Sequence, residues 1–353
     1  MMKQEEFRRL VRGESRGWLA SATRGALWVL SLPYALGVSL RNLAFDRGWR
    51  EVVRARLPVL SVGNVTVGGT GKTPMVEYFA SQLREKGLRV CLLSRGYGVS
   101  DGPNDEALVL EENLPDVPHL QGRNRAQLAT IADEELESQV LVLDDGFQHR
   151  RLGRDADVVL IDATDPFGGG RLLPAGLLRE PFSSLGRADL VVLTRRDAID
   201  EDQRRSIKRR LGRWTKAPWA EVSFDPTALV DAEGAERPIA ALAGKRVATF
   251  CGLGNPEGFR RTVALLGGET IDHRDFPDHH PYSRDDIESL LAWVAEVRPE
   301  LVLTTQKDLV KVRLTLLGSV PLAAVKIAAR VDEGAEAIDH VLAQIAAKVP
   351  REE

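Results

Sequence analysis

The stretch SVGNVTVGGTGKTPMVEYFA, residues 61–80, decides the fold that we expect for this chain. Its apolar start predicts a buried strand, followed by a loop containing Gly68, Gly69 and Gly71 and by a helix that begins near Pro74. Glycines let backbone N–H groups turn inward around phosphate oxygens, and the helix N-terminus adds the positive end of its dipole. The segment therefore predicts a P-loop, which binds the phosphates of a nucleotide.

The loop fits the pattern G-x-x-x-x-G-K-[ST] at every defined position except the first, where Thr66 stands. Gly68 and Gly69 supply the backbone freedom instead, and the strand and helix context disfavours a chance glycine turn. We expect Lys72 to reach the β- and γ-phosphates and Thr73 to hold Mg²⁺. The predicted nucleotide-binding residues are Thr66, Val67, Gly68, Gly69, Thr70, Gly71, Lys72 and Thr73.

A second motif follows a different apolar run. Residues 140–143 lead directly into Asp144 and Asp145, and then into the sequence GFQH. Carboxylates at the carboxyl end of a buried strand are placed to hold the magnesium of a P-loop enzyme, whereas the alternative is a pair of acids that opens a turn. Beside the P-loop, the motif indicates a magnesium–nucleotide site with Thr73, Asp144 and Asp145 as metal ligands.

Length and composition set the class of protein. The chain has 353 residues, of which 43% are hydrophobic and 28% charged, and these values exclude wholesale disorder, a fibrous repeat and a polytopic membrane protein. Cys91 and Cys251 are the two cysteines and lie far apart, so a disulfide framework is disfavoured and a reducing, intracellular compartment is expected.

Apolar runs alternate with helical segments along the chain, which is typical of buried parallel sheets. The fold class we expect is α/β: a P-loop NTPase-like parallel sheet domain plus a second, smaller α/β domain, with an N-terminal membrane-associated helix. The predicted divisions are residues 1–56 for the N-terminal segment, 57–213 for the nucleotide-binding domain, 214–238 for a connection and 239–353 for the C-terminal domain. Strands are expected near residues 59–62, 89–93, 140–143, 158–161, 190–193, 247–251, 301–303 and 322–327.

The N-terminal segment is basic, with 11 Lys+Arg against 5 Asp+Glu in residues 1–56. No charge occurs from Gly25 to Leu40, but this run of 16 residues contains Pro33 and is shorter than the about 20 apolar residues that a spanning helix needs. A cleaved signal peptide fits poorly. Arginine flanks and aromatic residues favour a helix in the headgroup layer of an anionic membrane, and a helix packed against the domain is the alternative.

The residues alone leave two classes of function open. One is a kinase with a bound acceptor, and the other is a P-loop switch ATPase or GTPase that acts on a protein partner or in metal delivery. A dinucleotide oxidoreductase is disfavoured because the GLG at residues 252–254 lacks the third glycine of its fingerprint.

Seven segments, in order along the chain, resemble the tetraacyldisaccharide 4'-kinase family of the lipid A pathway. They are the P-loop stretch, LLSRGYG (92–98), NDEALVL (104–110), LDDGFQHRRL (143–152), LLPAGLLREP (172–181), FPDHHPY (276–282) and TTQKD (304–308). The resemblance implies phosphorylation of the 4'-hydroxyl of a tetraacyldisaccharide 1-phosphate, with ATP and Mg²⁺. It also implies an acylated glucosamine disaccharide lipid and an anionic membrane surface as partners, no nucleic acid, and a peripheral or monotopic place at the cytoplasmic face of the inner membrane.

The same resemblance implies roles for individual residues. Asp105, which follows Asn104 where the family has glycine, matches the catalytic base, and Lys72 and His279 complete the catalytic set. His280 is the alternative histidine, and a zinc site from Asp278, His279 and His280 is a further alternative. Ser283 and Asp286 have the spacing of a capping box, so a helix is expected to follow this loop. The positions that match substrate-binding residues are Arg95, Tyr97, Gln148, His149, Arg179 and Glu180; Lys307 and Asp308 belong to the last motif without an assigned role.

Overall fold

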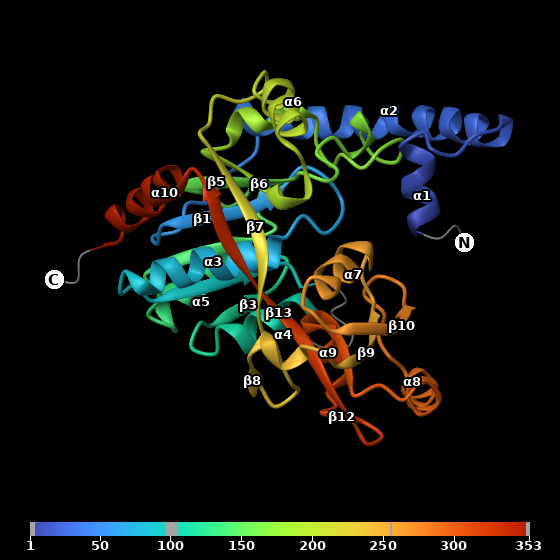
Figure 1. Ribbon diagram of the computed structural model, residues 1–353. Coiled ribbons are helices and arrows are strands. Elements are labelled where there is room, and N and C mark those ends of the chain that lie inside the picture. The colour runs from blue at the N-terminus through green and yellow to red at the C-terminus, as the bar shows by residue number, and fades with distance from the viewer. Residues whose placement is uncertain (1–3, 97–104, 255, 351–353) are drawn as a thin grey trace. The chain divides into compact units, whose positions relative to one another are not determined.

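Strand β1, which comes from the predicted P-loop stretch, lies in the middle of a parallel sheet in the computed structural model (Figure 1). The strand order is β7 (Trp219–Val230), β6 (Leu190–Thr194), β5 (Ala156–Asp162), β1 (Val59–Asn64), β4 (Val140–Asp144), β2 (Val90–Ser94) and β3 (His119–Gln121). Every residue of β1, β2, β4 and β6 is buried, as expected for a parallel sheet covered on both faces. The five strands that the sequence predicts in this region are confirmed.

Helices cover this sheet and extend from it. They are α1 (Gln4–Val11), α2 (Trp18–Asp46), α3 (Lys72–Glu85), α5 (Arg125–Glu134), α6 (Glu201–Leu211) and α10 (Ala335–Ala347), with short 3₁₀ turns at Gly168–Gly170, Phe182–Arg187 and Arg196–Ala198. Helix α3 packs on β1, β2 and β4, α5 packs on β2 and β3, and α10 contacts α3 and β6. The core of this part is therefore built from apolar side chains on both faces of the sheet.

The same sheet continues beyond β7, where the strand order is β13 (Val320–Glu333), β11 (Leu301–Thr305), β9 (Arg246–Cys251) and β10 (Glu269–Asp275), with parallel pairing among these four strands. Strand β13 also pairs with the short β12 (Leu316–Leu317) and neighbours β7, which pairs with β8 (Glu236–Arg237). The helices are α4 (Asp105–Asn113), α7 (Pro256–Ala264), α8 (Arg284–Val297) and α9 (Gln306–Val312), with a 3₁₀ turn at Ile239–Leu242. The predicted capping box at Ser283 and Asp286 is confirmed at the start of α8.

The structure describes residues 4–96, 105–254 and 256–350. Unit 1 comprises residues 1–96, 116–223 and 329–353, and unit 2 comprises residues 97–115 and 224–328. Two segments thus belong to a different unit from the one that their place in the sequence suggests. Helix α4 lies in unit 2 although its residues stand between two segments of unit 1 in the sequence. Helix α10 lies in unit 1 although it follows the residues of unit 2 in the sequence.

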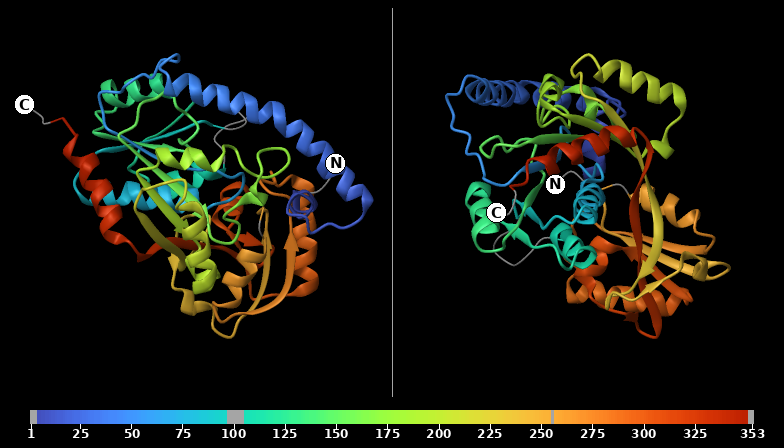
Figure 2. Two further views of the ribbon diagram at one scale, coloured as in Figure 1. Left: turned by 90° about the horizontal axis from the view of Figure 1, so that it is seen from above. Right: turned by 90° about the vertical axis from the view of Figure 1, so that its left-hand side faces the viewer.

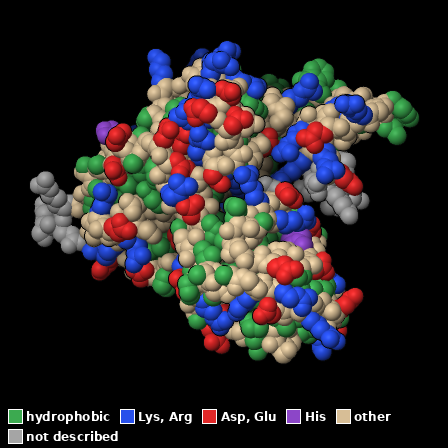
Figure 3. All heavy atoms as spheres, viewed as in Figure 1, with side chains coloured by type: hydrophobic (Ala, Val, Ile, Leu, Met, Phe, Trp, Pro, Cys, Tyr) green, Lys and Arg blue, Asp and Glu red, His purple; other side chains and the backbone are tan. Residues whose placement is uncertain are grey.

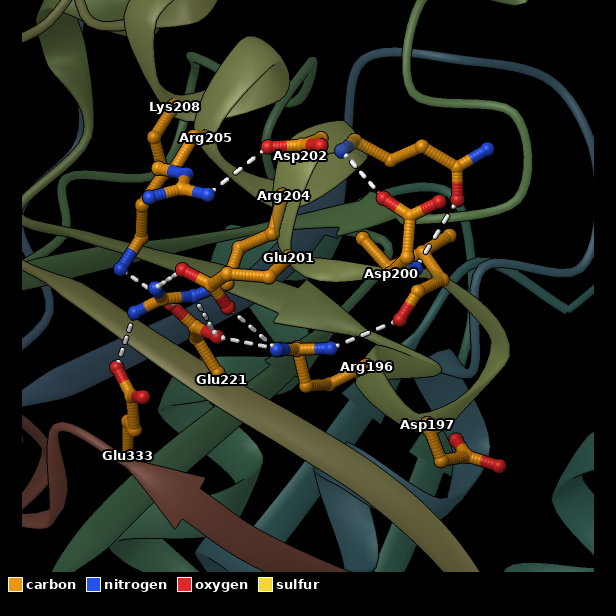
Figure 4. A network of polar contacts seen from close by, with 12 residues as sticks. Arg196, Asp197, Asp200, Glu201, Asp202, Arg204, Arg205, Lys208, Glu221 and Glu333 are labelled. Atoms are coloured by element: carbon orange, nitrogen blue, oxygen red, sulfur yellow. Dashed lines mark hydrogen bonds and ion pairs between the residues drawn. The ribbon is translucent and has the colours of Figure 1, made fainter.

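A buried carboxylate in unit 1 joins α6 to the returning end of β13 (Figure 4). Glu221 on β7 is 1% exposed and accepts hydrogen bonds from Arg196 and Arg204, and it also pairs with Lys208. Arg204 extends the network to Glu333, the last residue of β13. Three cations around one buried acid satisfy its oxygens, so the C-terminal return of the chain is held in this unit.

Helix α2 is a continuous helix of 29 residues with Pro33 inside it (Figure 2). Residues spaced three and four apart face unit 1, with Ser31, Val38 and Phe45 buried and Tyr34 and Arg41 partly buried. The rest of the helix exposes large apolar side chains: Trp18, Leu19, Trp28, Val29, Leu30, Leu32, Leu36, Leu40 and Leu43. Among the described residues, no helix is both long and apolar enough to cross a membrane.

Candidate active site

The P-loop connects β1 to α3 in unit 1, and its backbone is held on several sides. Asn64 Nδ2 donates to Thr66 O at 2.7 Å, and the backbone N–H of Val67 donates to Leu177 O at 2.7 Å. Thr194 Oγ1 on β6 donates to Thr70 O at 2.9 Å. These contacts hold the backbone of the loop in place, which is the preorganisation that phosphate binding needs.

Two glycines of the loop adopt backbone angles that other residues rarely reach. Gly68 has φ +124°, and Gly71, which precedes the first turn of α3, has φ +81°. Helix α3 begins at Lys72, two residues earlier than predicted, so Lys72 and Thr73 lie in its first turn. The N–H groups at this helix start and the Lys72 side chain thus lie at the same end of the helix.

Asp144 and Asp145 lie beside the P-loop because β4 pairs with β1. Asp144, the last residue of β4, stands in register with Val62 of β1 and is buried. Lys72 Nζ lies 3.8 Å from Asp145 Oδ1, and Arg179 Nη1 donates to both oxygens of Asp145 at 2.8 Å. Burial opposes ionisation of Asp145, but the charges of Lys72 and Arg179 outweigh it and lower the pKa of this carboxyl.

The donor set around the P-loop fits Mg²⁺. Thr73 and Asp144 are buried oxygen donors, and Mg²⁺ prefers hydroxyl, carboxylate and phosphate oxygens. Thr70 Oγ1 is also buried and has no hydrogen-bond partner among the described residues, so the loop keeps polar capacity for a ligand. Asp145 is the third predicted metal ligand, and in this structure its oxygens face Lys72 and Arg179 instead.

Two of the predicted substrate-binding residues, Arg179 and Gln148, lie beside Asp145. Gln148 Nε2 donates to Asn64 O at 2.8 Å, and Arg179 Nη1 lies 3.4 Å from Gln148 Oε1. His149 follows in the chain and is partly buried. Burial and the nearby arginines, Arg125 first, lower the pKa of His149 to about 4, so its ring is neutral at physiological pH.

Glu180, also predicted to bind substrate, has no exposed surface. Its carboxylate accepts hydrogen bonds from Arg41 and Asn42 of α2 and from Arg187 at 2.8 Å. Burial favours its neutral form, but Arg187, Ser184 and Arg41 outweigh burial and lower the pKa of Glu180. In this structure Glu180 connects α2 to the core of unit 1.

The remaining two predicted substrate residues are placed differently. Arg95 follows the last residue of β2 and is exposed at the carboxyl end of the sheet. Tyr97 lies outside the described residues.

Asp105 and His279 meet in unit 2, although 174 positions separate them in the sequence. His279 Nδ1 lies 2.9 Å from Asp105 Oδ2 and 3.0 Å from Oδ1. Burial raises the pKa of Asp105, but the hydrogen bond and charge of His279 and the charges of Lys307 and Lys311 outweigh it, so the pKa falls to about 2. The bond to Asp105 in turn raises the pKa of His279.

The last family motif braces this pair. Asp308, which is fully buried, accepts hydrogen bonds from Gly252 N at 3.0 Å and from Thr305 Oγ1 at 2.6 Å. The backbone N–H of His279 in turn donates to Gly252 O at 3.3 Å. His279 has φ +58°, an uncommon backbone angle for a non-glycine residue that this bracing helps to hold. Asp308 thus connects the start of α9 to Gly252, which in turn contacts the backbone of His279.

Two lysines on α9 reach α4. Lys311 Nζ lies 3.4 Å from Asp105 Oδ2 and 3.5 Å from Asp308 Oδ1, and Lys307 Nζ lies 2.6 Å from Glu106 Oε1. Lys311 was not among the predicted site residues. Its spacing of three after Asp308 on a helix was a signal for proximity to that residue, but nothing in the sequence connected it to Asp105.

The described residues do not bring Asp278, His279 and His280 together as a metal site. His279 Nδ1 faces Asp105, whereas His280 Nε2 lies 2.9 Å from Asp286 at the start of α8. His280 also stacks on Phe276 with ring centroids 5.0 Å apart. The two rings are therefore committed to different partners.

Arg125 is a second residue that sequence reasoning missed. It is 3% exposed at the start of α5, and its Nη1 donates to Asp145 O at 3.2 Å. Arginine in a first helical turn is unremarkable in a sequence, so no local signal marked it.

Comparisons with known proteins show the family of the chain. A family model described as tetraacyldisaccharide-1-P 4'-kinase matches residues 23–346. A tetraacyldisaccharide 4'-kinase from Anaeromyxobacter sp. (strain K) is 39% identical over 96% of this chain and 95% of its own length, and one from Halothermothrix orenii is 37% identical over 81% and 82%.

Among solved structures, the crystal structure of LpxK from Aquifex aeolicus in complex with ATP is similar, with a TM-score of 0.74 and 32% identity over 92% of this chain and 99% of that chain. The match of the family model over most of the chain and the identity to full-length relatives lead to one conclusion: this chain belongs to the tetraacyldisaccharide 4'-kinase family.

Proposed function

We propose that this chain transfers the γ-phosphoryl group of ATP to the 4'-hydroxyl of an acylated glucosamine disaccharide 1-phosphate, a step of lipid A biosynthesis. The observation that carries the proposal is a braced P-loop with two carboxylates at its side, in a chain whose family match spans residues 23–346. A P-loop switch also needs such a loop, but family membership favours the kinase.

The phosphate end of the reaction belongs to unit 1. Lys72 and the N–H groups of the P-loop bind the β- and γ-phosphates and neutralise charge as the transferred group leaves. Thr73 and Asp144 would hold Mg²⁺, with Asp145 as the further carboxylate, and the ion would supply positive charge that neutralises the phosphate groups. Arg179, whose Nη1 contacts both oxygens of Asp145, is released from this carboxylate as phosphate binds, because a guanidinium pairs with either anion.

Asp105 accepts the proton of the sugar hydroxyl. A pKa of about 2 keeps its carboxylate ionised at neutral pH, so it is always ready to accept. A base this weak takes the proton late, and late transfer suits a loose transition state in which the new bond to phosphorus is only partly formed. His279 orients the carboxylate through its Nδ1, and its ring stabilises the negative charge of Asp105.

The exposed apolar face of α2 docks on an anionic membrane surface. Its side chains gather along α2 in the space-filling view (Figure 3), while the opposite face is fixed to unit 1 through Tyr34 and Arg41. Such a helix lies in the interface plane with its apolar side in the acyl boundary. We place the protein at the cytoplasmic face of the inner membrane, where ATP and an acylated substrate meet.

Transfer of labelled phosphate from ATP to a tetraacyldisaccharide 1-phosphate in detergent micelles tests the proposal. The expected result is a labelled lipid that forms with the wild-type protein and not with Lys72→Ala. If folded wild-type protein hydrolyses ATP but yields no labelled lipid, the lipid kinase assignment is wrong and the P-loop switch becomes the better hypothesis.

A further inference from the structure

Helix α1 lies outside the segment that the family model matches, which begins at residue 23. It is nevertheless docked on unit 1. Leu10 and Val11 at its end are buried, and Arg12 Nη2 pairs with Asp165 at 2.6 Å. Because buried apolar side chains and an ion pair hold α1 in place, this helix is part of the folded unit.

A turn of three glycines separates α1 from the P-loop. A side-chain carbon built on Gly169 would lie 3.2 Å from Val11 O, and one built on Gly168 would lie 3.0 Å from Thr66 Cγ2. Gly168 and Gly169 thus let the end of α1 and the first residue of the P-loop pack against the two sides of one thin turn. This packing holds the end of α1 beside the loop.

One turn before Arg12, Arg8 reaches the P-loop itself. A side-chain carbon built on Gly68 would lie 3.1 Å from Arg8 Nη2 and 4.0 Å from Arg8 Cζ. The guanidinium is therefore in contact distance of the open side of Gly68, the side that a Cβ would occupy in any other residue. Gly68 stands four residues before Lys72, in the part of the loop that cradles nucleotide phosphates.

We propose that Arg8 is a γ-phosphate-binding residue, supplied to the P-loop by α1 from within the same chain. An arginine that donates to the transferred phosphoryl group stabilises the charge that spreads over its oxygens during transfer. The inference rests on the proposed function of the P-loop as the ATP site, and it deepens that function by adding a phosphate ligand outside the family motif.

The neighbouring Arg9 offers a matched control. Arg9 carries the same charge on the same helix and is exposed. It follows Arg8 in the sequence, so its side chain leaves the helix in a different direction from the side chain that reaches Gly68. Arg8→Ala and Arg9→Ala therefore change the net charge and the basic character of α1 equally, and only the first removes the contact with the loop.

The experiment measures binding of ADP and of a non-hydrolysable ATP analogue to the full-length protein, together with kcat and KM for ATP. For Arg8→Ala we expect the affinity for the ATP analogue and kcat each to fall by about tenfold or more, the size of one lost charge-assisted hydrogen bond. ADP affinity should stay within about twofold because ADP lacks the γ-phosphate, Arg9→Ala should match the wild type, and Arg8→Lys should recover part of kcat.

Two outcomes overturn the proposal. Equal behaviour of Arg8→Ala and Arg9→Ala shows that Arg8 has no specific contact with phosphate, and a faster Arg8→Ala enzyme shows that α1 obstructs the loop. Wild-type protein that binds neither nucleotide would contradict the proposed function of the P-loop instead, so the two failures are distinguishable. Unchanged melting of Arg8→Ala confirms that α1 stays docked through Leu10, Val11 and Arg12.

Discussion

Replacing Glu180 distinguishes a structural role from the substrate contact that its sequence motif implies. Its carboxylate has no exposed surface and receives hydrogen bonds from Arg41, Asn42 and Arg187. Glu180→Ala leaves two guanidinium groups without their shared acid. We therefore expect this variant to weaken the attachment of α2 to unit 1 before it affects any contact with lipid.

The magnitude follows from the burial of the three charges. Removing one partner of a buried ion pair costs about 3–5 kcal/mol, and the lower end applies because Arg41 and Arg187 are 30% and 22% exposed and can turn toward water. About 3 kcal/mol corresponds to a fall in Tm of roughly 6–12 °C for a unit of this size. Glu180→Gln keeps one acceptor oxygen and should lose less than Glu180→Ala, because the amide oxygen still accepts from one of the two guanidinium groups.

The assay combines a melting curve with steady-state kinetics on the lipid acceptor. Glu221→Gln is the matched control, because Glu221 is equally buried among Arg196, Arg204 and Lys208 in the same unit (Figure 4) and does not touch α2. Both variants should melt earlier, and only the Glu180 variants should also lose binding to anionic vesicles. A Glu180→Ala enzyme with wild-type melting and a raised KM for lipid alone would refute this reasoning and restore the substrate contact.

Four further outcomes are expected. Lys72→Ala and Asp144→Asn should each lower kcat at least about 100-fold with the fold intact, because each removes charge stabilisation at the transferring phosphoryl group; near-wild-type turnover would show that the nucleotide site lies elsewhere. Asp105→Asn and His279→Ala should lower kcat far more than ATP affinity, and the double variant should cost much less than the two single losses together, whereas additive losses would indicate separate roles. The ion pair of Asp105 and His279 should stabilise unit 2 most at mildly acidic pH. The stability that His279 contributes, because its pKa is raised, is fully present below about pH 6.5 and is lost as pH rises through the raised value. The stability that Asp105 contributes, because its pKa is lowered, is present above about pH 3.8 and is lost as pH falls toward 2. The difference in stability between wild type and Asp105→Asn, followed by denaturant unfolding, should therefore shrink from pH 6 to pH 9, and a difference that grows would contradict the pairing. Leu32→Glu with Leu36→Glu should release the protein from anionic vesicles without a change in melting, because both side chains are exposed, and high salt should release the wild type only in part because the apolar contribution is not screened.

The P-loop and the carboxylates beside it were predictable from the sequence because each is a short contiguous motif. Strand, glycine loop and helix follow one another within residues 61–80, and Asp144 ends a run of apolar residues that reads as a buried strand. Parallel pairing of β1 and β4 then brings Asp144 to the loop without any further information. Local pattern and sheet geometry were sufficient here.

The pairing of Asp105 with His279 was predictable only through the family resemblance. No periodicity connects residues 174 positions apart, and an aspartate at the start of a helix is an ordinary sequence feature. Helix α4 also belongs to unit 2 although its residues are inserted between strands of unit 1. The sequence order places it with the P-loop domain, so the domain boundaries predicted from sequence separate the two partners.

Glu180 shows why residue type alone misleads. A carboxylate in a loop is usually exposed, yet burial becomes favourable where arginines from two segments converge on it. One of these arginines comes from α2. The sequence could not show whether this helix packs on the protein or lies at a membrane, because some of its apolar residues are buried and others are exposed. The side of α2 that packs on the protein carries Ser31, Val38 and Phe45, and the exposed side carries Leu32, Leu36 and Leu40. Because both sides are rich in apolar residues, the sequence of the segment does not show which residues are buried.

This double use of α2 ties the expected membrane surface to the phosphate site. Tyr34 donates from its hydroxyl to Arg179 O at 3.0 Å, and Arg41 pairs with the adjacent Glu180. The Arg179 side chain in turn holds Asp145, which also pairs with Lys72 of the P-loop. Three contacts, from Tyr34 to Arg179, from Arg179 to Asp145 and from Asp145 to Lys72, thus connect the helix that we expect at the membrane to the residue that we propose to bind phosphate. Because the deletion of residues 18–41 would remove these contacts together with the exposed face, only substitutions on the outward side separate docking on a membrane from the integrity of the site.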